Sequence, residues 1–117
     1  MATLTHMISK EIQALREAFG CSQEAMARII GVSSRSVVRW EHEQAQPNFL
    51  VKQKLDELLA LSTKAQGIVQ KGKTAEWFNA PVEALGFKSP LEIIMQGSAG
   101  VREITDLLGR LEWGISE

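Results

Sequence analysis

Cysteine is almost absent from this chain, and long apolar runs and basic targeting segments are missing. The single Cys21 cannot form an internal disulfide, which fits a reducing compartment. Its apolar neighbours favour a small buried thiol over a nucleophile. No apolar run approaches the ~18 residues of a membrane-spanning helix, and the first residues, MATLTHMISKEI, do not have the pattern of a signal peptide. We therefore expect a cytoplasmic protein without a membrane partner.

Groups that hold metals or carry out catalysis are also scarce. The two histidines, His6 and His42, are far apart and have no cysteine or carboxylate at ligand spacing. Glu41 and Glu43 have no feature that marks a catalytic acid–base pair. We expect no metal site, no cofactor and no enzymatic activity.

The chain also lacks a large net charge of either sign. The 117 residues have a formal net charge of −1, which excludes a uniformly basic protein that coats nucleic acid. With 44% hydrophobic and 23% charged residues, the chain suits one soluble domain, or two small units that share a core. Any affinity for nucleic acid has to come from a local patch.

The chain does contain the pattern of a helix-turn-helix, in residues 22–41 (SQEAMARIIGVSSRSVVRWE). Ser22 and Ser33 stand where hydroxyl groups cap the starts of two short helices, and Gly31 stands at the turn between them. Ala27 is small where the two helices cross. The residues predicted to face inward are Met26, Ala27, Ile30, Val37 and Trp40.

The rest of the chain also has helical spacing and no strand-like alternation, so we predict an all-α fold. A stripe that should pack on the helix-turn-helix comprises Ile8, Ile12, Leu15 and Phe19. Residues 1–47 form the predicted DNA-binding region, residues 48–73 a connecting helix and residues 74–117 a second unit. In that unit Ser89-Pro90 is typical of a helix start. The final amphipathic helix is predicted from Val101, Ile104, Leu108 and Leu111.

In a DNA-binding helix-turn-helix the second helix lies in the major groove and its first residues meet base edges. Arg35 and Arg39 lie one helical turn apart, where two arginines can bind neighbouring guanines. Ser22 and Gln23 are better placed for phosphates. The candidate DNA-binding residues are Ser22, Gln23, Arg28, Ser33, Ser34, Arg35, Ser36 and Arg39. The alternative is that the arginines only form a solvated face.

Residues 22–40 contain three arginines and one glutamate, a local balance of +2. One such module should bind DNA weakly. Two modules on a homodimer would double the phosphate contacts and impose a palindromic operator. We therefore expect a homodimer or a higher assembly.

Residues 67–74 (GIVQKGKT) match the phosphate-loop pattern G-x-x-x-x-G-K-[ST]. A phosphate loop follows a hydrophobic strand, whereas the residues before Gly67 have helical spacing. We therefore expect no nucleotide site here, and we interpret Lys64, Lys71 and Lys73 as the solvated end of a helix.

The second half contains an ordered set of motifs: a tryptophan, a proline, a glycine turn, a [ST]-P-L-E helix start and a terminal helix that ends in glycine. These are Trp77-Phe78, Pro81, Leu85-Gly86, Ser89-Pro90-Leu91-Glu92, Gly97, Val101, Leu107-Leu108 and Gly114. Their order resembles the toxin-binding domain of Xre/MbcA/ParS antitoxins, with the helix-turn-helix in its usual place before it. Two positions depart from the family pattern, because glycine is common at Phe87-Lys88 and at Glu43.

This resemblance implies a partner toxin with the RES-type fold, which acts on NAD or uses it to modify proteins. It also implies that the antitoxin's C-terminal region covers the toxin's active site and that the antitoxin binds the promoter of its own operon. Residues 111–117 form an apolar segment with a polar end that could plug a cleft for a dinucleotide, with Trp113 as aromatic anchor. The candidate toxin-binding residues are Leu111, Trp113, Gly114, Ile115, Ser116 and Glu117. Alternatively, Trp113 and Ile115 pack on this chain's own helices.

Two functions follow from these patterns. The first is an antitoxin of a type II toxin-antitoxin system that neutralises a RES-type toxin and represses its own promoter. The second is a freestanding helix-turn-helix regulator without a toxin partner, whose C-terminal half only dimerises or senses a ligand. The two hypotheses differ in the role of residues 111–117.

Overall fold

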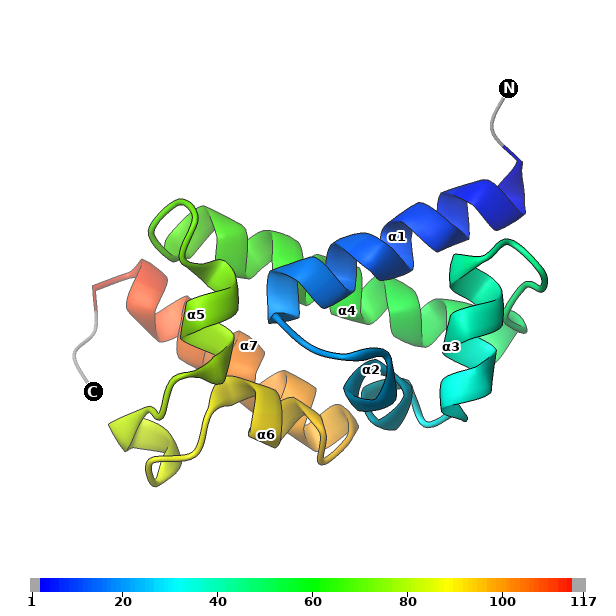
Figure 1. Ribbon diagram of the computed structural model, residues 1–117. Helices are drawn as coiled ribbons and strands as arrows, with labels where there is room; N and C mark the ends of the chain where they lie inside the picture. The colour runs from blue at the N-terminus through cyan, green and yellow to red at the C-terminus, as the bar shows by residue number, and fades with distance from the viewer. Residues whose placement is uncertain (1–2, 115–117) are drawn as a thin grey trace.

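The computed structural model describes residues 3–114, which fold into helices joined by short turns (Figure 1). The N-terminal elements are α1 (Leu4–Phe19), α2 (Gln23–Ile30), α3 (Ser34–Glu41) and the long α4 (Phe49–Ile68). The C-terminal elements are α5 (Thr74–Asn79), the 3-10 helix η1 (Glu83–Leu85), α6 (Pro90–Ile94) and α7 (Ser98–Glu112). Within residues 3–114 the only β-type pairing is an isolated bridge between Val82 and Lys88. The predicted all-α fold is confirmed.

The helix-turn-helix begins its two helices at the predicted caps. The Ser22 hydroxyl accepts a hydrogen bond from the Ala25 backbone N–H at 3.1 Å, and the Ser33 hydroxyl accepts one from the Ser36 N–H at 3.2 Å. Gly31 ends α2 with a φ of 88°, a left-handed conformation that a residue without Cβ adopts at little cost. These caps fix the boundaries of α2 and α3.

Later helices also start where the sequence indicates. The Asn48 side-chain oxygen accepts from the Val51 N–H at 3.0 Å and begins α4. At α6 the Ser89 hydroxyl accepts from the Glu92 N–H at 3.2 Å, while the Glu92 carboxylate accepts from the Ser89 N–H at 2.8 Å. This reciprocal pair is a capping box, and it satisfies two N–H groups that a helix start leaves without partners.

One hydrophobic core joins the two halves of the molecule. The predicted stripe on α1 is buried along its length, from Ile8 to Phe19. The ring of Phe19 lies 4.7 Å from the ring of Phe78 on α5, in an edge-to-face arrangement. At the same junction the Asn79 amide donates a hydrogen bond to the Phe19 carbonyl at 2.8 Å. α4 also packs against α7, so the core extends from the helix-turn-helix to the last helix.

The last helix differs from its predicted apolar stripe at one position. Val101, Ile104 and Leu108 are buried, whereas Leu111, which is also a candidate toxin-binding residue, is 39% exposed. Leu111 lies in the final turn of α7, outside the hydrophobic cluster that holds the earlier turns. Leu107 is buried on the same face one turn earlier.

Close packing between α6 and α7 depends on Gly100. A Cβ added at this position would overlap the carbonyl oxygen of Ile93, so only glycine allows the first turn of α7 to approach α6 this closely. Among the helices of residues 3–114, none combines the length and the apolar character that crossing a membrane requires.

Candidate functional site

The exposed face of α3 carries the two predicted base-reading arginines. Arg35 and Arg39 are both exposed and stand four residues apart on the same side of the helix. On the opposite side Val37 is fully buried and Trp40 is 6% exposed, which confirms that these two residues belong to the core. The arginines are therefore presented from a helix whose inner face is fixed by packing.

The other predicted DNA-binding residues surround this face. Arg28 is exposed on α2, and Ser34 and Ser36 are half-buried in the first turn of α3. Ser22 and Ser33 are exposed, although their hydroxyl oxygens already accept the capping hydrogen bonds. The set lies on α2, α3 and the caps before them.

Gln23 has a partner inside the protein. Its side-chain amide donates a hydrogen bond to Glu41 Oε1 at 3.1 Å, and Glu41 also accepts from Arg16 at 3.0 and 3.2 Å. Ser9 donates to the Glu41 backbone carbonyl at 2.6 Å. The last residue of α3 is thereby tied to α1 and to the start of α2.

This cluster around Glu41 was not predicted from the sequence. Its other members lie 18 to 32 residues before Glu41 in the sequence, so no local spacing reveals the cluster. The Glu41 side chain is 9% exposed and Arg16 is 30% exposed, which makes the ion pair largely shielded from water. The cluster fixes the C-terminal end of α3 against the other two helices.

Cys21 lies beside the same cluster. Burial raises the pKa of its thiol to about 11; Arg16 lowers the pKa to a smaller extent and Glu41 raises it. The thiolate, which is the nucleophilic form, is therefore negligibly populated at neutral pH. Cys21 is half-buried against the core, so it is less buried than predicted, and its raised pKa agrees with the prediction that it is not a nucleophile.

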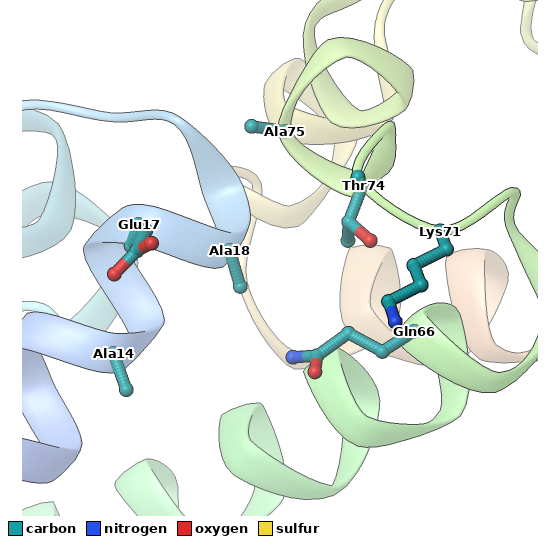
Figure 2. A pocket seen from close by; sticks show the side chains of 8 residues that line it. Ala14, Glu17, Ala18, Gln66, Lys71, Thr74 and Ala75 are labelled. Atoms are coloured by element: carbon teal, nitrogen blue, oxygen red, sulfur yellow. The ribbon is translucent and has the colours of Figure 1, made fainter.

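The residues that resemble a phosphate loop border a cavity of about 530 Å³ between α1, the end of α4 and the start of α5 (Figure 2). It is lined by Ala14, Glu17, Ala18, Gln66, Lys71, Gly72, Thr74 and Ala75. The segment before the loop is α4, and Gly67 lies inside that helix. Lys73 pairs with Glu76 at 3.4 Å. The loop does not have the strand–loop–helix context of a phosphate site, and the helical spacing predicted before Gly67 is confirmed. Lys71 and Lys73 are exposed, but they lie between α4 and α5 and not on a helix end as predicted.

The C-terminal end of α7 exposes apolar side chains. Trp113 is 82% exposed, so the alternative that it packs on the helices of its own chain is wrong for this residue. Leu111 and Gly114 are exposed beside it. The remaining candidate residues, Ile115, Ser116 and Glu117, lie outside the described residues. An exposed tryptophan of this kind is typical of a protein interface.

Comparison with known protein families accounts for both halves. Residues 68–114 match the antitoxin Xre/MbcA/ParS C-terminal toxin-binding domain, and residues 12–65 match a helix-turn-helix family. The chain therefore resembles antitoxins of the Xre/MbcA/ParS type, with the toxin-binding domain in its C-terminal region. The resemblance seen in the sequence is therefore confirmed, and the two matched regions meet at the end of α4.

Individual members of this antitoxin family are distant relatives of the chain. The mycobacterial cidal antitoxin MbcA of Mycobacterium tuberculosis is 25% identical over 92 residues, which are 79% of this chain and 81% of MbcA. The antitoxin Xre of Yersinia enterocolitica is 28% identical over 90 residues, 75% of this chain and 60% of that protein.

A solved structure has the same fold. This chain matches a protein chain in the crystal structure of the M. tuberculosis MbcT-MbcA toxin-antitoxin complex, with a TM-score of 0.71 and 22% sequence identity. The match covers 99% of this chain and 100% of the other. The arrangement of helices in Figure 1 is therefore shared with a known structure.

Proposed function

We propose that this protein neutralises a RES-type, NAD-dependent toxin in the cytoplasm and represses its own operon. The observation that carries the proposal is the solvent-exposed Trp113 at the end of a region that matches a toxin-binding domain. An exposed tryptophan buries a large apolar area when a partner covers it, and such residues dominate the binding energy of many interfaces.

The chemistry of residues 111–117 suits a cleft that binds a dinucleotide. Leu111 and Trp113 provide the apolar contact, and the side-chain carboxylate of Glu117 can meet the basic groups of a phosphate site. A segment that fills such a cleft excludes NAD from it. The antitoxin therefore acts by occupying the active site.

The helix-turn-helix, at the other end of the molecule, represses the operon. Arg35 and Arg39 are exposed on α3, where the second helix of a helix-turn-helix enters the major groove. With a local balance of only +2 over residues 22–40, one module makes few phosphate contacts. The protein therefore binds a palindromic operator as a homodimer.

The test uses growth of bacteria that express the adjacent open reading frame, with and without this protein. The neighbour alone arrests growth, and the full chain restores it. A variant without residues 111–117 no longer restores growth but still shifts operator DNA in a gel. A harmless neighbour that is properly expressed would instead favour a freestanding regulator.

Loss of both activities together, with unfolding in circular dichroism, would contradict this division of labour. The matched control is the double variant Arg35→Ala/Arg39→Ala, which keeps residues 111–117 intact. It restores growth and fails to shift the operator.

A further inference from the structure

The turn between η1 and α6 exposes a phenylalanine in an unusual backbone conformation. Phe87 has a φ of 65°, in the left-handed region that L-amino acids rarely adopt. Its side chain is 70% exposed. The residue combines a strained backbone with an apolar ring in water, and neither property helps the isolated chain to fold.

Backbone hydrogen bonds hold this turn in place. The Phe87 N–H donates to the Val82 carbonyl at 2.9 Å, and the Val82 N–H donates to the Lys88 carbonyl at 3.0 Å. The Lys88 N–H donates to the carbonyl of Leu85 at 3.3 Å, and the Leu85 side chain is buried in the core. The Phe87 ring is thus displayed by a fixed scaffold, so little backbone freedom is lost when a partner covers it.

The position of the turn indicates which partner it meets. Phe87 lies inside residues 68–114, the region that matches the toxin-binding domain. The turn and the end of α7 lie at one end of the molecule, and α3 lies at the other (Figure 1). The same short segment carries two exposed charged residues, Glu83 at the start of η1 and Lys88 directly after Phe87, and charged residues are typical of the rim of an interface.

We propose that Phe87 is a preformed anchor for the toxin, and that its ring inserts into an apolar pocket on the toxin surface. This contact is separate from residues 111–117, and the inference rests on the proposed antitoxin function. The strain at Phe87 is retained because glycine, which suits the backbone better, has no ring to bind.

Phe87→Gly separates binding from folding in the full-length protein. It relieves the backbone strain and removes the ring, so the melting temperature rises while affinity for the purified product of the adjacent toxin gene falls at least tenfold. Isothermal titration calorimetry measures the affinity. Phe87→Asn also tolerates the left-handed conformation without an aromatic ring, and it loses affinity to a similar extent.

The matched control is Glu43→Gly, at the other non-glycine residue with positive φ. It relieves the same kind of strain at the α3 end, and toxin affinity stays within twofold of the wild type. An unchanged affinity in both Phe87 variants, with wild-type binding intact, would overturn this inference alone. A wild-type protein that does not bind the toxin would overturn the proposed function and this inference with it.

Discussion

At the scale of single residues, the two departures from the family pattern have a common geometric meaning. Glu43 and Phe87 occupy positions where glycine is common, and both have positive φ, 60° and 65°. The family resemblance in the sequence identified these two positions, and the structure shows that both have a left-handed backbone conformation. Glu43 also contacts His6 at 3.2 Å, in a pair that is about 40% exposed and therefore contributes little to stability.

Cys21 makes the stability of the protein pH-dependent in the alkaline range. Its pKa is about 11 in the folded state against 9.0 for the free thiol, because burial disfavours the thiolate. Between pH 9 and 11 the unfolded state has lost a proton that the folded state keeps, so unfolding becomes more favourable as the pH rises.

Chemical denaturation at pH 8 and pH 10.5 measures this effect. The wild type loses more stability between the two pH values than Cys21→Ala, in which no thiol titrates. Equal losses in the two proteins would show that other groups account for the pH dependence. Labelling of folded Cys21 with a thiol reagent at pH 7 is expected to be slow for the same reason.

At the scale of helices, α3 is held by the cluster around Glu41 rather than by apolar packing alone. Replacing Glu41 with alanine leaves the Arg16 guanidinium without its carboxylate in a largely shielded site. We expect a loss of about 1–3 kcal/mol in the free energy of unfolding. Urea denaturation measures it, with Glu24→Ala on exposed α2 surface as the control that changes stability little. A loss as small as that of Glu24→Ala would show that the cluster does not stabilise α3.

The arginines of α3 determine sequence preference in our proposal. Arg35→Ala and Arg39→Ala should each reduce the preference for the operator over a scrambled site by about 1–3 kcal/mol, roughly 5- to 150-fold. Gln23→Ala, which also removes a hydrogen bond to Glu41, should weaken binding to both DNAs alike. A gel-shift series with the two sites tests this, and unchanged discrimination by Arg35→Ala would contradict base reading.

Local signals predicted the helices well, and long-range contacts could not be predicted. Ser22, Ser33 and Ser89 cap helices because their neighbours in sequence provide the N–H groups. The Arg16–Glu41 pair joins residues that are brought together only by the crossing of α1 and α3. The need for glycine at position 100 likewise arises from α6, a different helix.

At the scale of the whole molecule, exposed apolar residues gather at both ends. Trp113 and Phe87 lie in the C-terminal region, whereas Leu4 and Met7 on α1 and Phe49 and Leu50 on α4 lie at the start of their helices. Glu11, two turns after Leu4, pairs with Lys52 at 3.8 Å, so the start of α4 lies beside the middle of α1. His6 contacts Glu43, two residues after α3, which places the start of α1 beside the end of the DNA-binding helix.

We expect the exposed apolar side chains at the starts of α1 and α4 to form the homodimer surface, which we call the N-terminal patch. At about 200 Å² for a fully exposed large side chain, Leu4, Met7, Phe49 and Leu50 expose about 500 Å² of apolar surface. Together with a polar rim, this apolar area approaches the ~800 Å² per partner of a standard interface.

Phe49→Glu should place two like charges in this interface and convert the dimer to a monomer in sedimentation equilibrium. Phe87→Glu alters an equally exposed phenylalanine at the other end of the molecule, and that variant should remain dimeric.

Because the monomeric Phe49→Glu variant keeps only one set of phosphate contacts, the slope of log affinity against log salt concentration for operator binding should fall by about half. A monomer whose salt slope is unchanged would show that the patch joins two chains without pairing their DNA-binding helices.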